Sequence, residues 1–189
     1  MAPSQPFLHH RPRLSRRRFV AGCASIVGLF ATSPLLAAIP SQQSRTLAFS
    51  HTHTGERERV TYWRDGDYLA EGLGLLDRLL RDHRSGERTQ MDRSLFDMLY
   101  ALQLKVGEPG EFEIISAYRS PKTNEMLRNK SRGVAKRSLH MQGKAIDIRL
   151  GGCDLKRLRD AAVAMKAGGV GFYPGSNFIH LDRGPFRHW

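Results

Sequence analysis

The sequence predicts one domain that mixes helices with strand pairs, and three observations support this fold class. With 189 residues, the chain has the length of a single domain and a short tail. Apolar side chains recur at helical spacing in the segments 68–83, 92–106 and 154–166. Short runs rich in β-branched and aromatic residues lie around these segments and are separated by turn residues.

Residues 1–40 have the features of an export leader. A cationic start is followed by an apolar run rich in small residues, from Phe19 to Ala38. The segment 15–20, Ser-Arg-Arg-Arg-Phe-Val, resembles a twin-arginine signal, which implies export of an already folded protein in a bacterium. An uncleaved membrane anchor is the alternative, but the run is barely long enough to span a bilayer and is interrupted by glycine and proline. We therefore expect cleavage near Ala38 and a folded domain over 41–189.

The first half of this domain is expected to hold a strand pair and two helices. The strands at 46–49 and 58–63 are expected to pair through a Thr-Gly-Glu turn. A helix over 68–83 is followed by another over 92–106, for which Asp92 is the expected N-cap. These helices serve most simply as scaffold.

The second half is expected to hold the remaining strands and two more helices. The strand at 112–118 leads into a helix whose first turn starts at Pro121. A basic, polar loop follows at 128–137, and two glycines end the helix at 154–166. The other expected strands are 144–148, 170–173 and 178–183.

The formal net charge of +12 makes the chain strongly basic. Five arginines lie before residue 39, where there is no acidic residue, so part of this excess belongs to the leader. The loop at 128–137 lacks the interleaved aromatic residues of a nucleic-acid surface and lies on an exported chain, so we expect no nucleic-acid partner. A basic exported protein suits acidic polymers such as a bacterial wall or anionic lipid, although the charge serves solubility equally well.

His51 and His53 form a first candidate for metal binding, because their alternation puts two imidazoles on one strand face. The sequence offers no convincing further ligand beside them. We therefore interpret the pair as surface histidines.

A stronger candidate lies in the segments 138–147 and 180–182. Two imidazoles and one carboxylate are a ligand set that leaves one zinc position open, as in catalytic zinc sites. Alternation puts Asp147 on one face of its strand, and His180 shares a face with Asp182 on the other strand. Two neighbouring strands would bring these three side chains to one side of a sheet. Gly143 would let the chain turn sharply between His140 and the first strand.

The pattern Ser-x-His-x-x-Gly-x-Ala-x-Asp at 138–147, followed by the late His180, is similar to that of zinc D-alanyl-D-alanine peptidases and murein endopeptidases. The upstream segment 116–120 and the ending 169–189 resemble the murein endopeptidase K branch, which cuts cross-links between peptidoglycan stem peptides. The resemblance covers about residues 45–189.

This resemblance implies an α+β fold shared with the Hedgehog amino-terminal domain, in which helices pack on a small, mainly antiparallel sheet. It implies zinc on His140, Asp147 and His180, and it makes Arg119 the arginine that faces the substrate carbonyl or carboxylate. Many relatives carry a general-base glutamate three residues before the last histidine, where this chain has Asn177. Asp182 is therefore our candidate for the general base. Its alternative role is a structural ion pair with Arg183 or Arg187.

The implied function is a periplasmic zinc endopeptidase acting on D-Ala–diaminopimelate or diaminopimelate–diaminopimelate cross-links. Its partners would be the stem peptides and the twin-arginine export machinery, with no stable membrane span after processing. The residues expected to bind or position substrate are Tyr118, Ser120, Ser138, Tyr173 and Asn177, and Trp189 is expected to be a packing anchor. The alternatives are a catalytically silent wall-binding module that keeps the metal fold, and a D,D-carboxypeptidase.

Overall fold

The computed structural model describes residues 43–107, 110–131 and 133–189. These residues belong to one compact unit. The export leader predicted over residues 1–40 lies outside the described residues.

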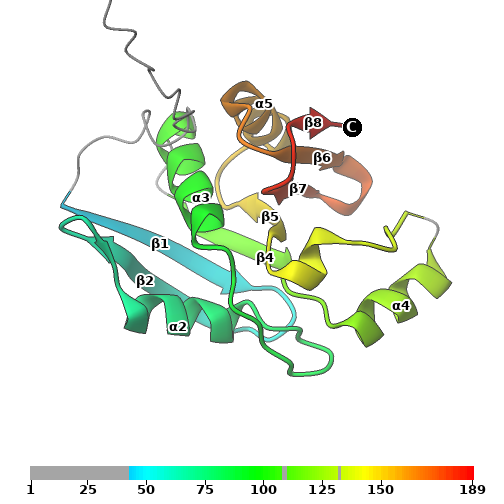
Figure 1. Cartoon of the computed structure of the whole chain (residues 1–189). Helices are drawn as coiled ribbons and strands as arrows, with labels where there is room; N and C mark the ends of the chain where they lie inside the picture. Colours follow the sequence, from blue (N-terminus) through cyan, green and yellow to red (C-terminus); the bar gives the residue numbers. More distant parts are fainter. Residues whose placement is uncertain (1–42, 108–109, 132) are drawn as a thin grey trace, which may run out of the picture. The chain divides into compact units, whose positions relative to one another are not determined.

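The described chain builds one sheet of eight strands in the order β3-β2-β1-β4-β5-β7-β6-β8 (Figure 1). Only the pairs β1–β4 and β6–β8 are parallel, so the predicted α+β fold with a mainly antiparallel sheet is confirmed. The strands are β1 (Ser44–His51), β2 (Arg57–Arg64), β3 (Asp67–Tyr68), β4 (Phe112–Ser116), β5 (Ala145–Leu150), β6 (Gly169–Tyr173), β7 (Phe178–Asp182) and β8 (Arg187–His188). The helices are α2 (Ala70–Leu79), α3 (Arg93–Val106), α4 (Pro121–Lys130) and α5 (Leu155–Met165), with two short 3₁₀ turns, η1 (Leu139–Gln142) and η2 (Pro174–Ser176).

One face of the sheet forms the hydrophobic core together with α2, α3 and α5. The sheet contributes alternate apolar residues, as the period of two requires, and the helices contribute an apolar stripe. Figure 1 shows α4 apart from these three helices, next to the segment that leads to η1. The core residues include Leu47, Phe49, Ile114, Ile146, Ile148, Ile179 and Leu181 from strands and Leu76, Leu95, Leu99, Leu102 and Leu158 from helices. The opposite face of the central strands is thereby left for polar side chains.

Local signals fix several element ends as predicted. The Asp92 side chain accepts a hydrogen bond from the Ser94 amide and caps α3, and Gly107 ends that helix in the left-handed conformation. Pro121 occupies the first turn of α4, where its missing amide hydrogen has no cost. Helix α2 ends at Leu79, earlier than predicted, and strand β8 and both 3₁₀ turns were not predicted.

The segment after α2 is tied to the end of β4 by Asp82. The Asp82 side chain is 1% exposed, and its oxygens accept hydrogen bonds from the amides of Ser120 (2.9 Å) and Arg84 (2.9 Å). The Tyr118 amide also donates to the Leu80 carbonyl at 3.0 Å. Burial raises the pKa of a carboxyl, but here the hydrogen bonds that Asp82 accepts outweigh burial and hold its pKa well below the usual range.

A bulge in β4 changes which face its side chains occupy. Ile114 lies opposite Ile148 on the core face, but the register then shifts so that Ser116 lies opposite Asp147. A bulge adds a residue to one strand and re-aims the side chains beyond it. Ser116 is therefore turned to the polar face, next to Asp147.

Gly143 makes the sharp turn between η1 and β5 that the sequence predicts. Its φ of 66° is left-handed, and a Cβ there would lie 2.7 Å from the Gln90 carbonyl oxygen. Its own carbonyl accepts a hydrogen bond from the Asp92 amide at 2.9 Å. The turn is thus packed directly against the chain that enters α3.

Among the described residues, no helix combines the length and the apolar character that crossing a bilayer requires.

We expect the substitution Gly143→Ala to destabilise the fold more than Gly55→Ala. Both glycines are left-handed, so each alanine pays roughly 1–2 kcal/mol for its backbone conformation. Only at Gly143 does the added methyl group also overlap a neighbouring carbonyl, because nothing lies within 4 Å of a Cβ at Gly55. Urea unfolding of the two variants measures the difference, and equal losses of stability would contradict the tight packing of this turn.

Candidate metal centre

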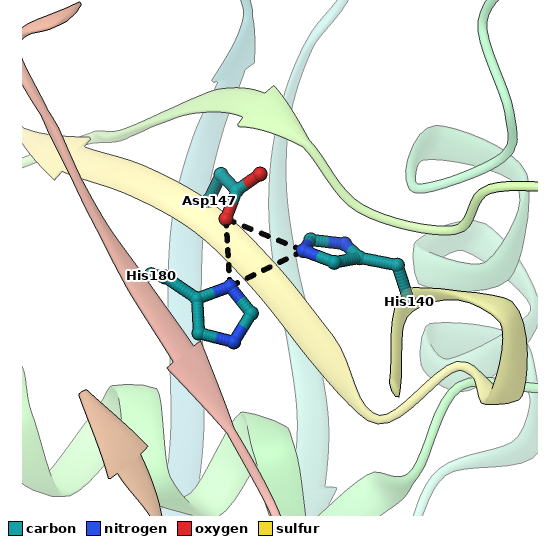
Figure 2. Close-up of side chains that lie close together, drawn as sticks. All are labelled: His140, Asp147 and His180. Carbon is teal, nitrogen blue, oxygen red and sulfur yellow. Dashed lines mark hydrogen bonds and ion pairs between the residues drawn. The ribbon is translucent and has the colours of Figure 1, made fainter. Parts of the chain in front are cut away.

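Three side chains from three separate segments point toward one another on the polar face of the sheet (Figure 2). His140 comes from η1, Asp147 from β5 and His180 from β7. His180 Nδ1 lies 2.8 Å from Asp147 Oδ1 and 3.2 Å from His140 Nε2, and His140 Nε2 lies 3.3 Å from Asp147 Oδ1. Among the described residues, these three form the group whose ligand atoms converge enough to share a metal ion.

The pairing of β5 with β7 positions two of the three groups. Asp147 lies directly opposite His180, and Ile146 and Ile148 point into the core on either side. Side chains directly opposite on one face of an antiparallel pair have Cβ atoms about 5 Å apart, which lets the two functional groups meet. The sequence prediction that these strands are neighbours, with Asp147 and His180 on the same side, is confirmed.

The backbone fixes the imidazole of His140. Its Nδ1 lies 2.6 Å from the Ala117 carbonyl oxygen, which can only accept, so Nδ1 carries the hydrogen. The lone pair of Nε2 then faces Asp147 and His180. The Ser138 hydroxyl accepts a hydrogen bond from the His140 amide at 3.3 Å and so caps the turn that carries the ring. His140 is 2% exposed, and this burial lowers its pKa and favours the neutral imidazole.

A carboxylate fixes the imidazole of His180 in the same way. Its Nε2 lies 2.9 Å from Asp182 Oδ2, and Asp182 also pairs with Arg187. Burial disfavours a charged Asp182, but the hydrogen bonds from His180, Arg187 and the Gly184 amide hold its pKa well below the usual range. An ionised Asp182 accepts a hydrogen from Nε2, which leaves Nδ1 of His180 facing Asp147 and His140.

The lone pairs of His140 Nε2, His180 Nδ1 and Asp147 Oδ1 therefore face one another, and a positive charge between these atoms would be stabilised. Burial alone would raise the pKa of Asp147, but His140, His180 and Arg119 hold it well below the usual range, so the group is a carboxylate. A proton on His180 Nδ1 or a metal ion satisfies this arrangement. Donor atoms bound tetrahedrally at 2.0–2.1 Å from zinc lie roughly 3.3 Å apart, close to the separations seen here. The residues present thus fit a metal ion with one open position.

Arg119 holds Asp147 from its other side. Its Nη2 forms an ion pair with Asp147 Oδ2, and its Nε donates to the Ser116 hydroxyl at 2.9 Å. The bulge in β4 is what brings Ser116 to this position. The guanidinium is thereby oriented at two points, beside the metal-binding groups.

The three side chains open on a cleft of about 320 Å³. Of the residues predicted to bind substrate, Ser138 and Tyr173 line this cleft, as does Arg119. Ser120 is fully buried and caps α4 by accepting from the Thr123 amide. Tyr118 and Asn177 are not among the lining residues, and Asn177 lies exposed just after η2 in the left-handed conformation.

The sequence reasoning missed the contribution of the last residues to the cleft. Arg187 and Trp189 both line it, and the Trp189 ring centroid lies 5.5 Å from that of His180. Trp189 Nε1 donates to the Tyr173 hydroxyl at 2.8 Å, yet the residue is 51% exposed, more than a packing anchor requires. The short segment after β7 carries no periodic pattern that could have predicted the position of Trp189.

The fold and the site together define a class of protein: an α+β domain whose sheet carries a buried His–Asp–His cluster at the base of a cleft. The chain belongs to the family described as peptidoglycan L,D-endopeptidase MepK, whose sequence profile matches residues 39–189.

Individual relatives match over most of their length. The chain is similar to the peptidoglycan L,D-endopeptidase MepK of Escherichia coli strain K12, at 40% identity over 176 residues, which are 93% of this chain and 97% of that protein. It is also similar to the probable peptidoglycan L,D-endopeptidase MepK of Haemophilus influenzae, at 42% identity over 156 residues, which are 82% of this chain and 84% of that protein.

A second group of histidines lies outside the cleft. His51 and His53 are joined by His83, which follows α2 and stacks on His53 with 4.2 Å between ring centroids. His51 is 1% exposed, so the prediction that it is a surface histidine is wrong, and its Nε2 has no hydrogen-bond partner among the described residues. Its Nδ1 accepts from the His53 amide at 3.2 Å, so the free Nε2 carries a hydrogen and offers no lone pair to a metal.

Stability should depend on pH through this second group. Burial, followed by the charge of Arg84 and the neighbouring histidines, lowers the pKa of His83 from 6.5 to about 4, and burial also lowers that of His51. The unfolded chain then binds more protons than the folded chain, so the free energy of unfolding should decrease as pH falls from 6.5 to about 4. Urea unfolding of the wild type and of His83→Gln tests this. The variant should show the shallower pH dependence, and identical slopes would contradict the assignment.

Proposed function

We propose that this protein is a zinc-dependent endopeptidase that hydrolyses the peptide cross-links of peptidoglycan. The observation that carries the proposal is the convergence of His140 Nε2, His180 Nδ1 and Asp147 Oδ1 at the base of a cleft, in a chain of this family. Two imidazoles and a carboxylate with an open fourth position are the donor set of catalytic zinc sites. The chemistry that zinc supplies there is polarisation of a peptide carbonyl and activation of water near neutral pH.

The chain's own residues would bind and orient the substrate around this point. Arg119, held by Asp147 and Ser116, is assigned the stabilisation of negative charge that develops on the carbonyl oxygen. Arg137 lies exposed at the cleft wall and can meet the free carboxylates of stem peptides. Tyr173 and Trp189, which are hydrogen-bonded to each other, add aromatic surface to the same cleft.

Asp182 has contacts that favour an orienting role. Both of its oxygens accept hydrogen bonds, it is 0% exposed, and the imidazole of His180 separates it from the convergence point. Its assignment as the general base stays a prediction. Ser138, which caps the turn carrying His140, supports a ligand in the same indirect way.

The family description favours one of the two possible bonds. The link between two diaminopimelates joins the L-centre carbonyl of one to the D-centre amine of the other, whereas the D-Ala link joins two D-centres. The relatives are named L,D-endopeptidases. We therefore propose the diaminopimelate–diaminopimelate link as the preferred substrate.

The substrate also implies the location. Cross-linked peptidoglycan lies in the periplasm, and the twin-arginine-like leader at residues 1–40 would bring the folded, zinc-loaded domain 41–189 there. Export in the folded state suits a metalloprotein, because the metal can be inserted before export.

Purified exported protein with zinc should release monomeric muropeptides from cross-linked peptidoglycan, as seen by chromatography. A chelator should abolish this release and added zinc should restore it. His140→Ala should reduce the release to background because one of three ligands is lost, while His53→Ala, a histidine of the second group, should leave it unchanged.

Two outcomes would separate this function from the alternatives. If the wild type binds peptidoglycan but releases nothing, and His140→Ala binds equally well, the protein is a wall-binding module. If only uncross-linked pentapeptides are shortened, it is a carboxypeptidase.

The bond preference is expected to appear with two defined dimers. A dimer joined between two diaminopimelates should be cut about tenfold faster or more than one joined through D-Ala, because the groups around the scissile carbonyl differ in handedness. The measurement compares kcat/KM for the two dimers at the same zinc concentration, and a preference for the D-Ala dimer would contradict the L,D assignment.

A further inference from the structure

Both oxygens of the Asp182 carboxylate accept hydrogen bonds from several donors. Its Oδ1 accepts from the amides of Gly169 (3.2 Å) and Gly184 (2.8 Å) and from Arg187 Nη1 (3.0 Å). Its Oδ2 accepts from Arg187 Nη2 (2.6 Å) and faces His180 Nε2 at 2.9 Å. Arg187 thus grips both oxygens, and this bidentate geometry fixes the plane of the carboxylate as well as its position.

Two glycines make room for this grip. A Cβ at Gly169 would lie 2.5 Å from both Arg187 Nη1 and Asp182 Oδ2, and a Cβ at Gly184 would lie 2.9 Å from Asp182 Oδ1. Neither Gly169 nor Gly184 has a left-handed backbone conformation, so the backbone alone does not require glycine at these positions. The missing side chains are what allow the guanidinium and carboxylate to meet.

The C-terminal segment holds Arg187 in place through the sheet. Strand β8 pairs in parallel with β6, with Arg187 opposite Gly169. The Trp189 amide donates to the Val170 carbonyl at 3.2 Å, and the Phe172 amide donates to the Trp189 carbonyl at 3.0 Å. The guanidinium carbon also lies 5.1 Å from the centroid of the Trp189 ring.

We propose that Arg187 is a positioning residue of the metal centre, which acts by locking Asp182 and, through it, the imidazole of His180. This inference rests on the proposed function in so far as His180 is a zinc ligand. A carboxylate that binds the outer nitrogen of a ligand histidine sets its orientation, and loss of such a partner typically weakens metal binding 10–100-fold. Arg187 is one contact further out. Without it, only the amides of Gly169 and Gly184 hold the carboxylate of Asp182 on this side, and both donate to Oδ1, so the orientation of Oδ2 toward His180 is less constrained.

The test measures the zinc affinity of the full chain by competition with a chelating dye, which needs no turnover. Arg187→Gln should weaken zinc binding by about tenfold or more. Arg187→Lys keeps the charge but loses the bidentate contact, so its zinc affinity should lie between those of Arg187→Gln and the wild type. The matched control is Arg183→Gln. Arg183 lies in the same segment but donates to the Ser94 hydroxyl (2.9 Å) and the Ala167 carbonyl (2.7 Å), so its loss should lower thermal stability without changing zinc affinity.

A double-mutant cycle with Asp182→Asn tests the route of the effect. If Arg187 acts through Asp182, the double variant should bind zinc no more weakly than Asp182→Asn alone. Unchanged zinc affinity in Arg187→Gln, or independent losses that multiply in the double variant, would overturn the proposal. A chain whose zinc affinity depends on Arg187 but which leaves peptidoglycan uncut would overturn the proposed function and leave this inference standing.

Discussion

The pairing of β5 with β7 is the constraint on which the rest of the site depends. It sets Asp147 directly across from His180 and, at the same time, buries Ile146, Ile148, Ile179 and Leu181 on the other face. A slip by one residue would turn these aliphatic side chains to the cleft and the ligands into the core. The hydrophobic core therefore specifies the register, and the register positions the chemistry.

Around this pair, each functional group is held by a further contact from outside the three converging side chains. The Ala117 carbonyl holds His140, Asp182 holds His180, and Arg119 holds Asp147. Such outer contacts remove the freedom of the side chains to turn, so less entropy is lost when a metal ion or substrate is bound. The polar face of the sheet thus behaves as a preorganised layer on top of a rigid core.

Much of this arrangement could be predicted from the sequence, because it follows from local rules. Strand alternation predicted that Asp147 and His180 share a face of the sheet. The preference of aspartate for N-caps predicted the role of Asp92, and the conformational freedom of glycine predicted the turn at Gly143. What could not be predicted depends on contacts that form only in the folded chain. The role of Ser116 requires a bulge that no composition signal marks. An ion pair of Asp182 with Arg187 was an alternative offered by the sequence, but its two-point geometry requires two glycines whose neighbours are known only after folding. Ser120, expected at the substrate, is instead fully buried at the start of α4.

The tie between Asp82 and the Ser120 amide has a consequence for how this enzyme family can diverge. The segment that carries Arg119 is hydrogen-bonded to the loop of Asp82, which precedes it by more than thirty residues. That loop contributes no residue to the lining of the cleft. Surface loops tolerate changes in length and composition more readily than the elements they connect. Variation accumulating in that remote loop can therefore shift Arg119, while the residues that line the cleft stay the same.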